Sequence, residues 1–455
     1  MIMANFCGNC GAALDDKAQC PNCNKNADNE ASNNQNSLQK SKKAKKGCLK
    51  KGCLFFLSII GLGIASVIVL VTLARNGVIT ADLLSKSPEV GSLLDQAFGE
   101  SCKCGDSAYW KLSEDAKTLL IYGEGELYEE NILEKNEIKL SYEEQKSIKY
   151  IVVDEGITKL SRHNFYSWEI DCLYLPSTLE EIDNAFYIFA EINQIKLNSD
   201  NRFFAMKDDV LFNSDFTALV KYTGCKMLSS YETPETINTI CCDAFCGNYA
   251  LKKLVVSSTT ETIEENAFAN MHSLEEIVIS DSVKEIGDSA FFGCEKLKSV
   301  ELSAGIEALS EGIFNGCVSL KNIVVPEGVE YIFACAFDGC TSLEKVTLPS
   351  TIETLGALSF RDCINLKEIN LPEGLKNLGG AGGGIFENDK GKVFENCTSI
   401  KEIIIPASIE KINWGVFSNW TEVQTIYMRV NGPGSEWREE WLENCNAKVV
   451  WDYKG

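Results

Sequence analysis

The feature that most constrains this chain is a 23-residue repeat that is clearest between residues 241 and 363. A phenylalanine recurs at this spacing six times, and the spacing resumes in two more copies after one insertion: Phe245, Phe268, Phe291, Phe314, Phe337, Phe360, Phe394 and Phe417. Repetition with a period of about 20 to 50 residues is typical of a solenoid, in which each turn buries its apolar residues against the next. We therefore expect a continuous column of rings, each about 4.8 Å from its predecessor, which is the spacing of parallel strands.

A strand pattern accompanies the phenylalanines. The phrase apolar-x-x-apolar-x-apolar occurs eleven times over about residues 148–428, starting at Ile148, Ile170, Ile192, Leu251, Leu274, Leu297, Leu320, Leu343, Leu366, Ile400 and Val423. The copy L-E-K-V-T-L-P from Leu343 is followed by S-F-R-D-C from Ser359. The length of the unit and the positions of its proline, phenylalanine and cysteine agree from unit to unit. Together they resemble the BspA-type leucine-rich repeat. The resemblance implies a mainly β, leucine-rich-repeat solenoid exposed at a cell surface.

Two insertions interrupt the array. Within about residues 198–226, the segment V-L-F-N-S-D-F-T-A-L-V-K-Y from Val210 predicts a hairpin that turns at residues 213–215. Within about residues 379–389 lies G-G-A-G-G-G, starting at Gly379. It lacks the G-x-x-x-x-G-K-[ST] pattern and the strand-to-helix context of a phosphate-binding loop. We interpret it as a flexible surface loop.

The two ends of the array need covers, because a terminal turn of a solenoid exposes an apolar face. Residues 102–147 alternate polar and apolar residues around Trp110, which predicts a hairpin and an N-terminal cap. Residues 429–455 contain Trp437, Trp441 and Trp451, which predicts a C-terminal cap. Residues 75–101 form a polar spacer before the first cap.

Residues 1–25 contain two C-x-x-C pairs, made by Cys7, Cys10, Cys20 and Cys23. Four thiolates at this spacing can hold one tetrahedral zinc ion, and a segment this short needs such a site to fold. A redox C-x-x-C pair is the alternative, but a thioredoxin-like unit around it is absent. The segment resembles a short bacterial zinc ribbon, and we expect a structural zinc ion.

A lysine-rich linker and an apolar segment follow. Residues 26–52 are polar and carry seven lysines between Lys40 and Lys51. Residues 53–74 contain no charge over 22 positions, which at 1.5 Å per residue gives a helix of about 33 Å that can span a bilayer. The positive-inside rule places the N-terminus in the cytoplasm and the array outside. A cleaved signal peptide is the alternative, but the apolar run is long for one and a metal site precedes it.

The charge balance restricts the partners of the array. The net charge is -22; residues 1–51 hold nine lysines against four acidic residues, a net of +5, which leaves -27 for the remainder. An array this acidic is a poor match for nucleic acid, because few positive charges are available to neutralise phosphates. Paired carboxylates such as Glu180 and Glu181 fall at outward positions, and His163 and His272 lie in different repeats. The sequence therefore offers no catalytic constellation, and we expect no enzyme.

Cysteines fall into two further groups. Five of them lie three residues after a repeat phenylalanine: Cys294, Cys317, Cys340, Cys363 and Cys397. Other units have asparagine, methionine or tryptophan at this position, so we interpret the column as packing with a weak thiol donor rather than as a metal site. Cys241, Cys242 and Cys246 form a denser group, for which a disulfide or a reactive thiol stays an alternative.

One outward column is unusually poor in charge. The residue between the last two apolar positions of each strand phrase is charged in two of eleven copies and includes Tyr174, Val255, Val278, Val324, Ile404 and Tyr427. Strand propensity alone favours β-branched residues at such positions. The alternative hypothesis is that this column, on the inner face of the solenoid, binds a ligand, because solenoids bind along an extended concave side.

These patterns predict a single-pass membrane protein with a cytoplasmic zinc ribbon and an extracellular solenoid. Its expected role is non-catalytic recognition or adhesion, with a protein or a glycan as ligand. A sensor that couples the solenoid to a cytoplasmic partner of the zinc ribbon is the first alternative. A hydrolase of envelope polymers is the second, which the missing catalytic set disfavours.

Overall fold

A computed structural model describes residues 102–113, 115–129, 142–162, 164–165, 168–186, 191–223, 228–380 and 391–455. The chain divides into two compact units, residues 1–78 and 79–455, and all the described residues belong to the second. The predicted zinc ribbon, linker, membrane span and spacer therefore lie outside the described residues, as do His163 and most of the glycine-rich insertion. Among the helices that the structure does describe, none has the length and apolar character to cross a membrane.

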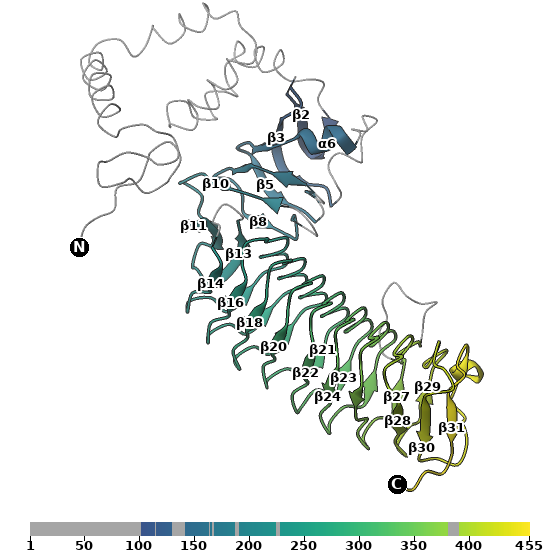
Figure 1. Ribbon diagram of the computed structural model, residues 1–455. Coiled ribbons are helices and arrows are strands. Elements are labelled where there is room, and N and C mark those ends of the chain that lie inside the picture. The colour runs from purple at the N-terminus through teal and green to yellow at the C-terminus, as the bar shows by residue number, and fades with distance from the viewer. Residues whose placement is uncertain are drawn as a thin grey trace, which may run out of the picture. The chain divides into compact units, whose positions relative to one another are not determined.

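The second unit is a mainly β solenoid, which confirms the predicted solenoid (Figure 1). One strand per turn follows the strand phrase, and strands of the same sheet pair in parallel; β16 (Lys253–Val255) and β18 (Glu276–Val278), for example, align Leu254 with Ile277, one repeat apart. The described residues contain twelve such strands: β4 (Tyr150–Val153), β7 (Cys172–Leu175), β10 (Ile195–Leu197), β14 (Ser230–Glu232), β16 (Lys253–Val255), β18 (Glu276–Val278), β20 (Ser299–Glu301), β22 (Asn322–Val324), β24 (Lys345–Thr347), β26 (Glu368–Ile369), β28 (Glu402–Ile405) and β30 (Thr425–Met428).

Shorter strands line a second side of the coil and also pair in parallel with the turns above and below. They are β5 (Ile157–Leu160), β8 (Glu181–Ile182), β15 (Thr239–Ile240), β17 (Thr262–Ile263), β19 (Glu285–Ile286), β21 (Ala308–Leu309), β23 (Tyr331–Ile332), β25 (Thr354–Leu355), β27 (Asn377–Leu378) and β29 (Lys411–Ile412). A separate pair joins β6 (Glu169–Ile170) to β9 (Glu191–Ile192). The pairing is interrupted between β10 and β14, between β20 and β22, and between β26 and β28, so the described turns fall into several sheets.

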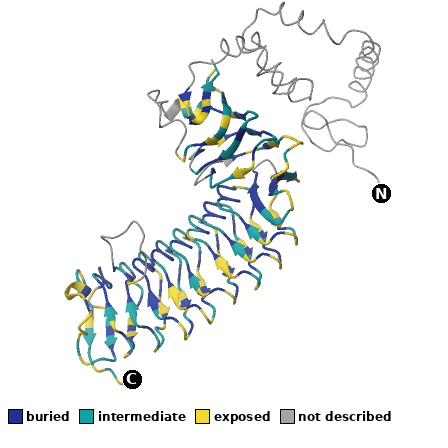
Figure 2. Cartoon of the chain, turned by 180° about the vertical axis from the view of Figure 1, so that it is seen from behind, coloured by how far each residue is buried: buried dark blue, intermediate teal, exposed yellow. Residues whose placement is uncertain are grey.

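The eight repeat phenylalanines are fully buried and stack in one column inside the coil. Neighbouring ring centroids are 5.2 to 5.9 Å apart. These distances exceed the 4.8 Å expected from strand spacing, and the ring planes are tilted by 9 to 35°. Tyr222 extends the column, with its ring 5.1 Å from that of Phe245. Figure 2 shows buried residues within each turn and exposed residues at its outer edge.

The structure adds a repeat that the eleven-copy count misses. Strand β14 pairs in parallel with β16 and aligns Tyr231 with Leu254. This copy starts at Leu228, which is exposed, and its last inward position is Thr233, which is buried. A tyrosine and a threonine replace the aliphatic residues of the phrase, so the apolar pattern conceals this turn.

The first insertion forms a three-stranded antiparallel unit made of β11 (Phe204–Lys207), β12 (Val210–Asn213) and β13 (Ala218–Tyr222). Its two faces are buried in different cores. Val210 and Phe212 belong to the core of the phenylalanine column, whereas Leu211 and Val220 belong to the core of the N-terminal turns. The predicted hairpin therefore separates two hydrophobic cores, and each of its faces packs against one of them.

Antiparallel and aromatic segments lie at the ends of the described array. Strand β1 (Cys102–Lys103) pairs with β2 (Gly105–Leu112), β2 pairs with β3 (Thr118–Leu127), and the helix α6 (Tyr142–Ser147) precedes the first turn. At the other end, a 3-10 helix (Glu439–Leu442) and β31 (Lys448–Val450) follow the last repeat. Trp437 and Trp441 are buried there, and the Trp441 ring lies 6.1 Å from Phe417. Both segments thus lie where the sequence predicts caps.

Candidate ligand-binding face

The charge-poor column lies on the strand side of the coil. Its residues sit one position beyond a buried strand residue, so the alternation of a β-strand directs their side chains outward. Val324 is the most exposed of the six, at 65%, and Ile404 is 37% exposed; Tyr174, Val255, Val278 and Tyr427 are half-buried. Parallel pairing places Val255 next to Val278, and Ile404 next to Tyr427. Tyr174 and Val324 lie in two other sheets, so strand register aligns the predicted residues only within each sheet.

The C-terminal end of this column is partly covered. The ring of Tyr427 packs against Tyr453, with the ring centroids 4.4 Å apart. Arg429 forms an ion pair with Glu373, which lies two repeats earlier in the array, and its guanidinium also donates to the Gly455 carbonyl at 3.2 Å. The last residues of the chain therefore cover part of the Tyr427 side chain, which the sequence pattern does not indicate.

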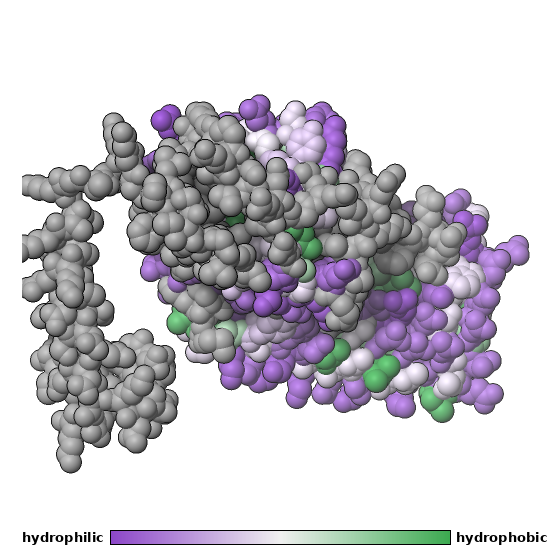
Figure 3. All heavy atoms as spheres, turned by 90° about the horizontal axis from the view of Figure 1, so that it is seen from above, coloured by the Kyte–Doolittle hydropathy of each residue, from purple (hydrophilic) through white to green (hydrophobic). Residues whose placement is uncertain are grey.

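Lysine and glutamate residues flank the column and pair with each other between turns. Lys253 Nζ lies 2.6 Å from Glu276 Oε1, Lys345 Nζ 2.7 Å from Glu368 Oε2, and Lys367 Nζ 2.9 Å from Glu344 Oε2. Each pair spans one repeat and is exposed, so each contributes little to stability. Each of these charged groups nevertheless lies beside a group of opposite charge. Figure 3 shows a mainly hydrophilic surface on which apolar side chains form isolated spots.

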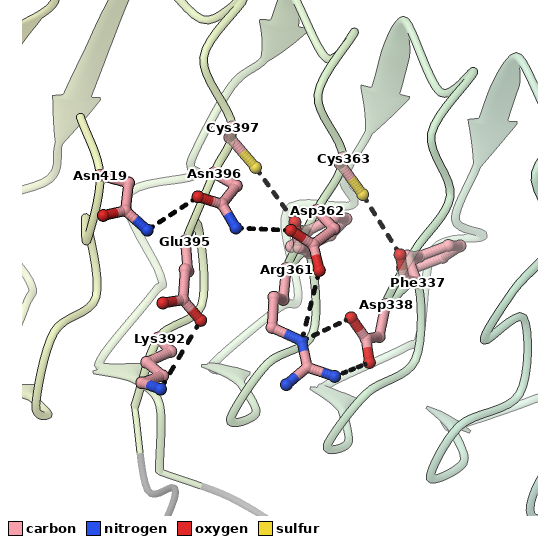
Figure 4. Close-up of polar contacts among 11 residues, drawn as sticks. Phe337, Asp338, Arg361, Asp362, Cys363, Lys392, Glu395, Asn396, Cys397 and Asn419 are labelled. Carbon is pink, nitrogen blue, oxygen red and sulfur yellow. Dashed lines mark hydrogen bonds and ion pairs between the residues drawn. The ribbon is translucent and has the colours of Figure 1, made fainter. Parts of the chain in front are cut away.

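The turns on another edge carry the cysteine column. Each thiol donates to the carbonyl oxygen of the phenylalanine one turn earlier; Cys340 Sγ lies 3.2 Å from Phe314 O, and Cys397 Sγ 3.0 Å from Phe360 O. Trp420 occupies the same position and donates its Nε1 to Phe394 O at 2.9 Å. Figure 4 shows the Cys363 and Cys397 contacts side by side. These thiols act as buried packing groups with a weak donor.

Burial determines the protonation of these thiols. Desolvation raises the pKa of Cys294 from 9.0 to about 12 and raises that of Cys317 well above 9.0. Unfolded chains lose these protons near pH 9, whereas the folded chain keeps them. We therefore expect the contribution of these thiols to stability to be constant below about pH 9 and to be lost as the pH rises towards 12.

Chemical denaturation between pH 7 and 11 checks this expectation. The variant Cys294→Ala with Cys317→Ala should show a shallower alkaline loss than the natural chain, whereas Cys445→Ala, at a half-buried site, should change the slope less. Equal alkaline slopes in the natural chain and the double variant would contradict a role for the buried thiols.

The same edge carries a chain of polar contacts across four turns (Figure 4). Arg361 Nε donates to Asp338 Oδ1 at 2.8 Å and lies 3.8 Å from Asp362 Oδ2. Asn396 donates to Asp362 at 2.6 Å and accepts from Asn419 at 2.8 Å. Asp338 is buried, and desolvation raises its pKa although the hydrogen bond from Arg361 lowers it. These contacts tie neighbouring turns together.

The turn at this edge also requires a left-handed backbone conformation at one position, and the residue types in the sequence reflect it. The second residue after every repeat phenylalanine has a positive φ between 55 and 75°. Glycine, asparagine and aspartate tolerate this left-handed conformation best, and only these occur there: Gly247, Asn270, Gly293, Gly316, Gly339, Asp362, Asn396 and Asn419. The pattern is a sequence signal for the turn that the phenylalanine count alone does not use.

The denser cysteine group lies mostly away from solvent. Cys246 is buried, and Cys241 and Cys242 are half-buried. Desolvation raises the pKa of Cys241 to about 12, and burial together with Glu264 raises that of Cys242 further. Reactive thiols need a lowered pKa. The raised pKa values of Cys241 and Cys242 disfavour a reactive thiol at these two positions, and a disulfide in this group stays a prediction.

The other candidates for chemistry stay apart. His272 stacks on Tyr249, with its Nδ1 3.9 Å from Glu295, and Glu181 pairs with Lys159 at 2.8 Å. Across the ranges that the structure describes, no three acidic, histidine or cysteine side chains gather as a metal site would require. The zinc ligands Cys7, Cys10, Cys20 and Cys23 lie outside the described residues and stay a prediction.

Comparisons with known proteins are consistent with this fold. Residues 138–220, 217–343, 261–391 and 307–448 match the family described as BspA type leucine-rich repeat region, in six copies. No curated protein matches the chain.

Several solved structures are similar to parts of this chain. A leucine-rich repeat protein from Eubacterium ventriosum is 20% identical over 61% of this chain and 92% of its own, with a TM-score of 0.40. A leucine rich cell surface protein from Faecalibacterium prausnitzii is 17% identical over 59% and 94%, with a TM-score of 0.36. The pneumococcal vaccine antigen PcpA is 16% identical over 77% and 99%, with a TM-score of 0.38.

Proposed function

We infer, since this chain belongs to the BspA-type leucine-rich-repeat family, that it works by non-catalytic recognition. In this proposal the chain is an adhesion protein held at the outer surface of a cell membrane. The premise comes from a family match that reaches from residue 138 to residue 448. The ligand is a protein or a glycan. The apolar segment 53–74 supplies the anchor and residues 1–25 a zinc-bound cytoplasmic ribbon; both parts of the proposal rest on the sequence alone.

The observation that carries the proposal is the outward column at Tyr174, Val255, Val278, Val324 and Ile404. Rigid, hydrogen-bonded strands hold it, so a ligand meets a surface that needs little ordering on binding. Paired charges flank it, which leaves apolar contacts along the middle and polar groups at the rim, as in many interfaces. Recognition fits this arrangement better than catalysis, because the described residues contain no grouped acid, base and nucleophile.

Binding of the full-length chain to arrays of immobilised surface proteins and glycans tests the proposal. Val324→Lys should weaken binding of a captured ligand at least about tenfold, because a charge would enter an apolar contact. Val423→Lys is a matched control, since Val423 is 69% exposed but lies outside the column. Failure to capture any ligand, or equal loss in both variants, would contradict recognition through this column.

The first alternative is a sensor in which the zinc ribbon reports occupancy of the array to a cytoplasmic partner. The observation that favours it is the pair of C-x-x-C motifs on the far side of the apolar segment. Cys7→Ser with Cys10→Ser separates the two functions. Unchanged attachment of cells with a changed intracellular response would indicate a sensor, whereas unchanged attachment and response would favour adhesion alone.

A further inference from the structure

The sheet at the start of the array carries apolar residues on both of its faces. Strands β1, β2, β3, β4, β7 and β10 follow one another in this sheet. Its inner face is almost fully buried at Ala108, Trp110, Leu119 and Ile151. Strand alternation then places the next residues on the opposite face, namely Tyr109, Leu120, Tyr122 and Val152. We call these four residues the N-terminal outer face.

The sequence of these strands is typical of a sheet that is covered on both sides. β3 contains the run L-L-I-Y from Leu119, and β4 reads Y-I-V-V. A near-continuous apolar run indicates a strand that is buried on both faces, whereas alternation with charged residues indicates one solvated face. The later strands β16 and β18 read K-L-V and E-I-V, so charged residues lie on their outer side. The N-terminal outer face therefore requires a cover that the later strands do not.

Strand register gathers the N-terminal outer face into one patch. Tyr109 lies opposite Tyr122, with the ring centroids 6.0 Å apart, and Leu120 lies beside Val152. Tyr109 is 38% exposed, and the other three residues are half-buried. The four strands β1 to β4 span about 14 Å at the usual strand spacing. A covering element should therefore be about as long as this.

Lysines border the N-terminal outer face, but they are not left for a ligand from outside. Lys103 and Lys111 align with members of the face across β1, β2 and β3. Both lysines already have partners within the chain. Glu124 lies one row farther along β3, and Asp154 follows β4. A partner that the chain itself supplies therefore fits this face better than an anion from solution.

The spacer that leads into β1 contains a segment that could cover this face. Residues 88–98 lie outside the described residues, and their sequence is P-E-V-G-S-L-L-D-Q-A-F. Apolar residues recur in it at helical spacing: Val90, Leu93, Leu94, Ala97 and Phe98. Ser87 before Pro88 is typical of a helix start, and Gly99 is typical of a helix end. A helix over residues 88–98 would be about 16 Å long, which is close to the width of the four strands.

We propose that residues 88–98 form an amphipathic helix whose apolar side packs on the N-terminal outer face. Residues 99–101 join this segment to β1 and span at most about 10 Å. So close an attachment gives the segment a high effective concentration at the face, which a second copy or an outside ligand does not have. Burial of the apolar side against Leu120, Tyr122 and Val152 supplies the main stabilisation.

The charges of the segment suit the borders of the face. On a helical projection, Glu89 and Asp95 fall on opposite sides of the apolar residues. The helix can therefore place its apolar side on the sheet while a carboxylate meets the lysine border. Such surface pairs contribute little to stability. They set the direction of the helix more than the strength of its packing.

The packing has a consequence for the proposed function, on which this step alone rests. With residues 53–74 as the membrane anchor, residues 75–87 are the connection between the anchor and the docked helix. Their reach is at most about 45 Å. The first sheet of the array is then held within that distance of the membrane surface.

Hydrogen exchange and hydroxyl-radical oxidation of the full-length chain in detergent test the proposal. The amides of residues 90–98 should exchange at least about tenfold more slowly than those of an unstructured chain. Leu93→Ser with Phe98→Ser should abolish this protection and raise the oxidation of Tyr122 at least about threefold, because the ring loses its cover. Tyr249, which is 53% exposed, is the internal reference for oxidation.

A matched variant makes the result specific. Leu83→Ser with Leu84→Ser removes two leucines of the same spacer that precede Pro88, and it should change neither measurement. Rapid exchange of residues 90–98 in the natural chain would overturn the proposal. Unchanged Tyr122 oxidation in the Leu93→Ser, Phe98→Ser variant would overturn it too, since the segment would then pack elsewhere, for example on detergent. Tyr122 protection that is lost on dilution would assign the face to a second copy. These measurements use no ligand, so they are independent of the Val324→Lys result.

Discussion

Replacing Phe314 with alanine should lower the free energy of unfolding by about 3–5 kcal/mol. Phe314 is fully buried, with its ring 5.2 Å from Phe291 and 5.5 Å from Phe337. Both neighbouring rings are fixed by their own turns, so the surrounding structure can fill little of the resulting cavity. Urea denaturation followed by circular dichroism measures the effect.

Two controls make the Phe314 result specific. Phe314→Leu keeps part of the volume and should cost less than Phe314→Ala. Val324→Ala removes an exposed side chain of the same turn and should change stability by about 0.5 kcal/mol or less. A loss below about 1 kcal/mol for Phe314→Ala would show that the ring column is not what holds successive turns together.

Replacing Trp441 with alanine should cost about 3–5 kcal/mol locally and loosen the last turns first. Trp441 is buried, and its ring lies 5.5 Å from Trp437 and 6.2 Å from Trp451. In a solenoid each turn contacts only its neighbours, so an uncovered end turn frays before the middle does. Hydrogen exchange should accelerate in β28 and β30 more than in β16 and β18.

The cap experiment also has an internal comparison. Trp441→Phe retains an aromatic ring against Phe417 and should leave exchange in β30 closer to that of the natural chain. Uniform acceleration along the whole array would indicate a global loss of stability. Unchanged exchange in β30 after Trp441→Ala would contradict the interpretation of residues 429–455 as a cap.

The period was enough to predict most of the array. Every repeat phenylalanine is buried where the 23-residue spacing places it, because one residue per turn at a fixed position must face the same interior. The apolar pattern did not predict the turn of β14, since Tyr231 and Thr233 occupy positions where the pattern has aliphatic residues. The pattern did not predict the burial of Lys221 either. This residue is 2% exposed, and its Nζ donates to the Asp243 carbonyl at 2.7 Å. A polar residue that is buried through specific contacts leaves no periodic signal.

The candidate sites were predictable to different degrees. The outward column follows from strand alternation, so Val255, Val324 and Ile404 could be placed on one side from the sequence. The cover over Tyr427 depends on the return of the chain to Tyr453, which strand alternation does not describe.

The hairpin of β11, β12 and β13 has a consequence for how mechanical load would pass along the protein. Because its two faces belong to separate hydrophobic cores, a pull on one end can rupture one block of turns while the other block keeps its packing. We expect single-molecule extension to show two main rupture events rather than a continuous series. A protein built this way would lengthen in stages under load and retain one intact block while the other yields.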